Sequence, residues 1–308
     1  MASFAPWAAA LAGFRLVRER PLSVPAWAGV IFLGRLAGLV LTTAMSGRYM
    51  PALDAAVNAK TIDPQAVALA YQPVAPGYLA GAVLAMPFIA VVVAAIYRAY
   101  LRPQEGRGCF LRLGRSEGAV LVLIISLNLL VMVGLFFAAA MIATLANLVA
   151  AADQASGALV EIAGLGGSLF FLVWAMARLS LAWPMTFQSD RLVLFRSWRL
   201  TKAQAWPLLG AFVMAEALMV LVAILLFAVC AGLAGAAVVA MGGTIDQMSE
   251  ALRPATRVAE LFQPLPMVFL AFEALLLTLV ATTLQGVAVS AYHSLDPQEI
   301  DAATPAWR

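Results

Sequence analysis

The chain has 308 residues, of which 64% are hydrophobic and only 11% are charged, and its formal net charge is +3. A soluble domain averages about 45–50% apolar and roughly 25% charged residues, so this composition excludes a water-soluble fold and predicts an integral membrane protein. The Lys and Arg residues lie in short clusters between apolar stretches, which excludes a basic nucleic-acid-binding domain.

The first 22 residues predict an amphipathic helix that lies in the membrane interface. Their apolar part, residues 8–11, comes before Arg15, Arg18 and Arg20, whereas a secretory signal peptide carries its positive charges ahead of its apolar region. Large apolar residues recur on one helical stripe of this segment, at Phe4, Trp7, Leu11 and Phe14. Such a stripe beside basic residues is typical of a helix that lies on a membrane.

Six apolar stretches are long enough to cross a hydrocarbon core of roughly 30 Å as helices. They comprise residues 24–44, 77–101, 119–150, 159–183, 206–240 and 266–292. We therefore expect an all-α integral membrane protein with six transmembrane helices in one domain, residues 1–308. The third and fifth stretches exceed the length that a bilayer requires, so these helices should tilt or continue beyond it.

The distribution of Lys and Arg predicts the orientation of these spans, because cytoplasmic loops carry an excess of positive residues. Fourteen of them flank the spans on the side of the N-terminus, and only Arg48, Lys60, Arg253 and Arg257 lie on the other side. We expect a multi-pass protein of the bacterial inner (plasma) membrane with both termini in the cytoplasm. The connections at 47–76 and 241–265 should form short amphipathic helices that cap the opposite end, in preference to a ligand lid.

A similar basic element precedes each odd-numbered span. Residues 14–18, 111–115 and 195–199 each contain an apolar residue, an Arg, two further residues and a second Arg. This pattern indicates three helical hairpins related by a pseudo-threefold axis along the membrane normal. Selection for cytoplasmic arginine places Arg at such helix ends in any membrane protein, so this explanation stays open beside the repeat.

The most distinctive stretch lies between the fourth and fifth spans. It contains Arg196, Ser197 and Trp198, followed by Leu200, Thr201 and Lys202. This Arg-Ser-x-x-Leu-Thr element resembles the membrane domain attached to some bacterial glycerophosphodiester phosphodiesterases, and the six-helix inner-membrane proteins of the YciC-like group. The resemblance implies a six-helix fold with an accessory membrane role. It does not imply phosphodiesterase activity, because these 308 residues leave no room for the enzyme's soluble barrel.

The basic residues at the cytoplasmic helix ends are candidates for binding anionic phospholipids or a membrane-protein partner. Each cation near an anionic membrane surface contributes ~1 kcal/mol. These candidates are Arg15, Arg18, Arg98, Arg112, Arg115, Arg178, Arg196, Arg199 and Lys202.

Three charged residues fall inside the predicted spans, where each costs on the order of 3 kcal/mol and is a functional candidate. Arg35 and Glu216 lie at similar depths, so we expect them to form an ion pair. Glu273 has no obvious cation. With Asn128 and Gln285 it forms either a polar path for a solute or proton, or hydrogen bonds that fix helix packing.

Small-residue pairs, Gly34/Gly38 and Gly77/Gly81, favour close helix contact.

Catalytic motifs are absent from the sequence. His293 is the single histidine, which excludes an HExxH zinc site, and there is no P-loop or Gly-rich dinucleotide fingerprint, so we expect no enzyme, metal or cofactor. The expected function is a non-catalytic membrane module that binds lipid or a partner protein. The alternative is a small-solute or proton-coupled transporter or channel with a polar path near Arg35, Glu216 and Glu273.

Overall fold

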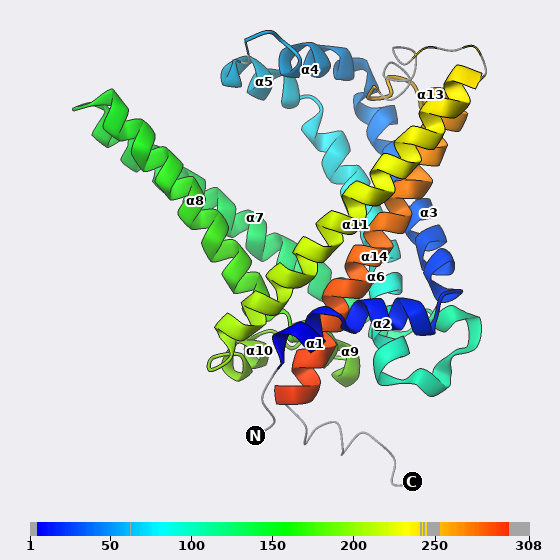
Figure 1. Cartoon of the computed structure of the whole chain (residues 1–308). Coiled ribbons are helices and arrows are strands. Elements are labelled where there is room, and N and C mark those ends of the chain that lie inside the picture. The colour runs from blue at the N-terminus through cyan, green and yellow to red at the C-terminus, as the bar shows by residue number, and fades with distance from the viewer. Residues whose placement is uncertain (1–4, 62, 241, 243, 245–252, 296–308) are drawn as a thin grey trace. The chain divides into compact units, whose positions relative to one another are not determined.

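The computed structural model describes residues 5–61, 63–240, 242, 244 and 253–295. Across these residues all the regular secondary structure is helical (Figure 1). The chain divides into two compact units. Unit 1 contains Met1–Ala12, Leu113–Ala215 and Leu284–Arg308, and unit 2 contains Gly13–Arg112 and Glu216–Thr283. The two unit boundaries in the second half of the chain fall within long helices, between residues 215 and 216 and between residues 283 and 284.

Six helices in the described part of the chain are long and apolar enough to span a membrane, which confirms the predicted number. They are α3 (Ser23–Ser46), α6 (Ala75–Leu101), α7 (Arg115–Ala150), α8 (Gln154–Leu179), α11 (Ala205–Ala240) and α14 (Pro264–Leu295).

Helix α8 begins earlier than its predicted start at residue 159 because Asp153 caps it. The Asp153 carboxylate accepts hydrogen bonds from the Ser156 hydroxyl and from the backbone N–H groups of Ser156 and Ala155. These hydrogen bonds, that of the Ser156 side chain above all, hold the pKa of the Asp153 carboxyl below its ordinary value. An Asp at this position also interacts favourably with the helix dipole. Hydropathy alone misses this start, because the first turn of α8 contains polar residues.

The N-terminal segment forms two helices where one was predicted: α1 (Pro6–Ala10) in unit 1 and α2 (Ala12–Glu19), which lies almost wholly in unit 2. Within unit 2, Leu16 of α2 packs against Trp27 and Ile31. Arg15 and Arg18 are exposed on the same helix. The amphipathic character predicted for this segment is therefore present in α2, whose apolar side contributes to a core of the protein itself.

Helices α3 and α6 of unit 2 cross closely at the two predicted glycine pairs. A Cβ added to Gly81 would lie 2.5 Å from the Gly38 carbonyl oxygen, and one added to Gly38 would lie 2.7 Å from that of Gly81. The Thr42 hydroxyl, buried at the same contact, lies 2.9 Å from the Gly38 carbonyl oxygen and 3.0 Å from that of Gly77, so the two acceptors share its one proton. Small residues thus bring the backbones together, and a hydroxyl on one helix contacts carbonyl oxygens of both, a pattern that is also found where membrane helices pack.

Unit 1 is built on the hairpin of α7 and α8, which run side by side (Figure 1). Gly157 of α8 lies against Ala146 and Ala150 of α7, and Gly164 lies against Ile142. Two shorter helices follow, α9 (Ala182–Ser189) and α10 (Phe195–Leu200). Leu181 and Met185, at the start of this segment, are buried in an apolar cluster with residues of α1, α11 and α14 that belong to the same unit.

Short helices form in the connections where they were predicted. The 47–76 segment contains the 3₁₀ helix η1 (Gly47–Tyr49) and helices α4 (Met50–Val57) and α5 (Pro64–Tyr71). In the 241–265 segment the structure shows α13 (Val258–Leu261), whereas Met248 and Leu252 lie outside the described residues.

The contact between α3 and α6 gives a test with a matched control in the same unit. Gly81→Ala should reduce stability by roughly 1–3 kcal/mol, because the added methyl group overlaps the backbone of α3. Gly29→Ala, on the exposed side of α3 with no atom near its added Cβ, should be neutral or should stabilise by up to about 1 kcal/mol through helix propensity. Unfolding of the purified variants in detergent measures both. Equal stability of the two variants would contradict the close contact.

Candidate functional site

Arg35 and Glu273 form an ion pair in unit 2. The Arg35 Nη2 atom donates to Glu273 Oε1 at 2.6 Å. At roughly 1.5 Å per residue, Arg35 lies about 18 Å along α3 and Glu273 about 14 Å along α14, far from either end of both helices. The two side chains are 39% and 40% exposed, so the pair is accessible from one side.

This pair corrects two predictions. Arg35 was expected to pair with Glu216, and Glu273 was expected to lack a cation. Glu216 instead lies on an exposed part of α11, and Glu273 is the carboxylate that Arg35 contacts. Similar depth along two helices does not show that two side chains face each other. The packing of α14 beside α3 and the helix faces that meet there decide which carboxylate lies within reach.

A cavity of about 850 Å³ in unit 2 extends to this ion pair. Its apolar wall follows one face of α14 and includes residues of α3 and α11: Leu39, Phe227, Phe269, Leu270, Phe272 and Leu276. Glu273 lies in the same wall. Its polar lining comes from α4, α13 and neighbouring residues, at the end of the unit where α14 begins: Asp54, Arg253, Thr256, Glu260 and Gln263. The cavity is thus polar at that end and mainly apolar deeper in the unit.

Hydrogen bonds and backbone packing hold the polar end of the cavity in place. The Glu260 carboxylate accepts from the backbone N–H groups of Thr256 and Arg257, at 2.8 and 3.2 Å, and from the Thr256 hydroxyl. The Thr256 backbone hydrogen bond contributes most to a Glu260 pKa below the ordinary value of a glutamate, so this carboxylate is ionised at neutral pH. A Cβ on Gly47 would overlap the Thr256 carbonyl oxygen, so this segment lies directly against the end of α3.

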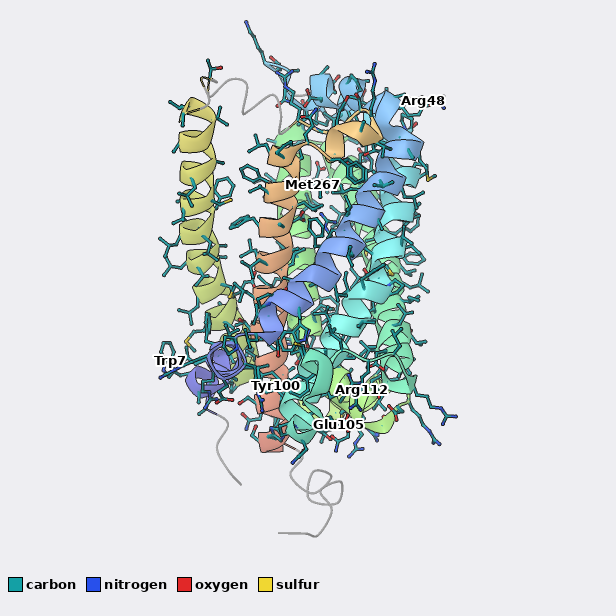
Figure 2. The ribbon with its side chains drawn as sticks, turned by 90° about the vertical axis from the view of Figure 1, so that its right-hand side faces the viewer. Trp7, Arg48, Tyr100, Glu105, Arg112 and Met267 are labelled. Carbon is teal, nitrogen blue, oxygen red and sulfur yellow. The ribbon has the colours of Figure 1, made fainter. Side chains whose placement is uncertain are left out.

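The other end of unit 2 contains basic residues with internal partners (Figure 2, Glu105 and Arg112). Arg98 is buried, and its guanidinium donates to the Phe110 carbonyl oxygen and lies 3.5 Å from the Glu105 carboxylate. Arg112 is exposed and also pairs with Glu105, at 3.1 Å. The Trp27 indole N–H donates to the carbonyl oxygen of residue 109 at 2.8 Å.

These contacts support a strained turn. Cys109 and Phe110 both have positive φ angles, 54° and 65°, a conformation that costs roughly 1–2 kcal/mol for a residue with a side chain. The hydrogen bonds from Trp27 and Arg98 to the carbonyl oxygens of these two residues offset that cost. Arg98, expected to bind lipid, is therefore used within the fold, because a buried guanidinium must have acceptors.

Arg178 has a similar internal role in unit 1, at the end of α8. Its guanidinium carbon lies 4.0 Å from the ring centre of Trp198 and 5.2 Å from that of Trp174, so it contacts two indoles that pack edge to face with their ring centres 5.3 Å apart. It also donates to the Trp198 carbonyl oxygen and to the Thr201 hydroxyl. In return, the Ser197 hydroxyl donates to the Arg178 carbonyl oxygen at 2.7 Å. Arg178 too was expected to bind lipid, and its burial among these partners corrects that expectation.

The Arg178 contacts explain the distinctive element at residues 196–202. Ser197, Trp198 and Thr201 face Arg178 and attach α10 to the end of α8. Arg196, Arg199 and Lys202 alternate with them and are exposed. Arg115, at the start of α7, is exposed as well. The element therefore has one side that packs on α8 and another that carries positive charge.

The two amide candidates are not part of the cavity. Asn128 is exposed on α7, and its side-chain N–H donates to the Ile124 carbonyl oxygen one turn earlier, at 2.9 Å. Asn128 and Gln285 both belong to unit 1, whereas Glu273 belongs to unit 2, so the polar path that would join the three stays a prediction. Within the described residues, no three His, Cys, Asp or Glu side chains form a group able to hold a metal ion.

Three charged residues of the cavity lining, Asp54, Arg253 and Glu260, were not identified as site candidates from the sequence, because they lie in segments that connect the long helices. Nothing in their spacing indicates that α4, α13 and α14 bring them to one cavity. The one local signal is Glu260 at the third residue of α13, after the N-cap Arg257, which is the position of the acidic residue in a capping box.

Paired substitutions test the partner of Arg35. Arg35→Met and Glu273→Gln should each destabilise the protein, because each leaves one charge without its partner. The double variant should recover about 1 kcal/mol or more relative to the sum of the single changes. Arg35→Met combined with Glu216→Gln should show no such recovery. Thermal unfolding in detergent measures the coupling, and recovery with Glu216→Gln instead would restore the original pairing.

Comparison with protein-family models, curated proteins and solved structures returned no match. The resemblance of residues 196–202 to phosphodiesterase membrane domains therefore stays a prediction. Two features of the molecule bear on its function, the cationic side of α10 in unit 1 and the cavity beside the Arg35–Glu273 pair in unit 2.

Proposed function

We propose that the chain is a non-catalytic, multi-pass membrane protein that binds an anionic lipid surface through α10 and the residues around it. Exposed large apolar side chains support insertion in a bilayer, since soluble proteins rarely expose so many together. Among the most exposed are Phe136, Phe137 and Leu148 of α7 and Leu159, Ile162 and Leu169 of α8.

The single observation that carries the lipid proposal is the composition of the exposed side of the 191–206 segment. Phe195 is 81% exposed and Trp206 is 66% exposed, and Arg196, Arg199 and Lys202 are exposed near them in sequence. Residues 191–215 contain four Arg or Lys residues and no Asp or Glu. Aromatic rings beside basic residues suit the boundary between acyl chains and anionic headgroups.

The structural role of Arg178 strengthens this proposal. Because Arg178 fixes Trp198, Ser197 and Thr201, α10 has a defined orientation against α8 and presents its cations together. The excess of Lys and Arg on this side of the spans supports the further proposals that α10 and both termini face the cytoplasm of a bacterial inner membrane. The threefold relation between hairpins rests on the three Arg-x-x-Arg elements of the sequence.

Two double variants with the same loss of charge test the lipid surface. Arg199→Gln/Lys202→Gln should weaken retention of phosphatidylglycerol by about 30-fold at low salt, since each cation near the surface contributes ~1 kcal/mol. Arg48→Gln/Lys60→Gln removes one Arg and one Lys, both also exposed, outside this segment and should leave retention nearly unchanged. Lipid titration monitored by native mass spectrometry measures both. Equal losses, or no loss in the first variant, would contradict the proposal.

A second candidate function is the binding of a small solute, as in a transporter or channel. The observation that favours it is the cavity of about 850 Å³, because solute sites in proteins commonly fall between about 300 and 1,000 Å³. Transporters also place such sites well inside the membrane-spanning helices, and the cavity extends to Glu273 and Leu276 of α14. The polar path proposed from the sequence then includes Arg35 and Glu273, without Glu216 in the lining.

Neighbouring leucines on α14 test whether water reaches this cavity. Leu276 lines the cavity about 18 Å along α14, whereas Leu277 is exposed outside it. With Cys109 and Cys230 replaced by serine, Leu276→Cys in vesicles should react with the water-soluble reagent 2-(trimethylammonium)ethyl methanethiosulfonate. Leu277→Cys should not react, because lipid surrounds it. Inert cysteines at both positions, or equal reaction at both, would exclude a water-filled solute site.

A further inference from the structure

We infer that the cavity of unit 2 binds an amphiphile with an apolar body and an amine-bearing, positively charged head. This inference rests on the second candidate function, the solute-binding cavity, and assigns the chemical class of its ligand. It follows from three features of the lining: an extended apolar wall, an excess of carboxylates at the polar end, and a neutralised charge in the deeper part.

The apolar wall accommodates the body of such a ligand. Pro266, Phe269, Phe272 and Leu276 recur at helical spacing along one face of α14. Phe227 of α11 lies opposite, with its ring centre 6.4 Å from that of Phe272. The lining therefore presents several phenyl rings, and it extends from the start of α14 to a depth of about 18 Å. That length suits an acyl or aryl body better than a small polar solute.

The polar end selects for positive charge. Asp54 and Glu260 line it with carboxylates, and Arg253 is the one cationic residue of the described lining. The backbone N–H groups of Thr256 and Arg257 fix Glu260, and the Asn58 side-chain N–H donates to Asp54 at 2.9 Å. An ionised carboxylate offers about four acceptor positions, so both groups retain acceptors for an ammonium head. A phenyl wall next to them also favours a cation over an anion.

The deeper charge does not alter this selectivity. Glu273 lines the cavity, but Arg35 neutralises it through the contact at 2.6 Å. Two carboxylates and one arginine of the lining therefore leave a single net negative charge at the polar end, and Arg257, outside the lining, reduces it through Glu260. The head of an amphiphile would be placed there while its body contacts the apolar wall. Two sources supply this chemistry, a free amphiphilic amine and the ethanolamine headgroup of a membrane lipid.

Protection of Leu276→Cys from the methanethiosulfonate reagent tests the inference in the full chain, without Cys109 and Cys230, in phosphatidylcholine nanodiscs. Dodecylamine at saturating concentration should slow the reaction by about ten-fold, as expected for a ligand that occupies the site. Dodecanol and dodecanoate, which have the same body with a neutral or negative head, should slow it less than about two-fold. Ala59→Cys, which is exposed just after the end of α4, corrects for the effect of each probe on the charge of the bilayer surface.

A second arm distinguishes the two sources. Phosphatidylethanolamine nanodiscs should protect Leu276→Cys if the ligand is a lipid head with N–H donors, whereas protection by dodecylamine alone assigns a free amine. Either result supports the inference. Asp54→Asn should reduce the protection several-fold, because it removes one of the two carboxylates, while Asp63→Asn at the cap of α5, outside the lining, should not.

Each failure has a separate meaning. A Leu276→Cys thiol that never reacts would overturn the solute-binding cavity itself. A thiol that reacts but is protected equally by all three dodecyl probes, or by none of them, would leave the cavity in place and overturn its preference for an amine.

Discussion

A guanidinium that is removed from solvent among apolar side chains needs acceptors within the chain, and this requirement shapes both units. Arg35 in α3 contacts Glu273 in α14, and Arg98 at the end of α6 contacts the Phe110 carbonyl oxygen and Glu105. Arg178 at the end of α8 lies beside two indoles and donates to the Trp198 carbonyl oxygen. In each case the guanidinium joins two different segments of the chain, because the cost of burying its charge falls when acceptors surround it.

The arginines of this protein therefore have two different roles. Arg98 and Arg178 hold a turn and a short helix against the ends of long helices, whereas Arg196, Arg199 and Lys202 are exposed. Arg178 contacts Trp198, Ser197 and Thr201 and so fixes the orientation of α10. The exposed cations of α10 therefore have a defined position on the end of α8. A short helix of this kind is otherwise marginal, because few intrahelical hydrogen bonds stabilise it.

The cavity depends on the same kind of support. Helices α3 and α6 pack closely at Gly38 and Gly81, with no space between their backbones. The phenyl and leucyl side chains of α14, in contrast, line a cavity next to α11. Glu260 and Thr256 fix the segment before α14, which also contacts the end of α3 at Gly47. A rigid polar end above an apolar wall is a suitable geometry for an amphiphile, whose two parts require different surroundings.

The sequence by itself determined the number of long apolar helices, the short helices of the 47–76 connection and the small residues at the contact of α3 with α6. These properties depend on hydropathy and on local spacing, which can be read along one chain. Only the tertiary structure decided that Arg35 contacts Glu273 instead of Glu216, that Arg98 and Arg178 face inward, and that Asp54, Arg253 and Glu260 line one cavity. These outcomes depend on which helix faces meet, and side chains far apart in sequence carry no local signal of that meeting.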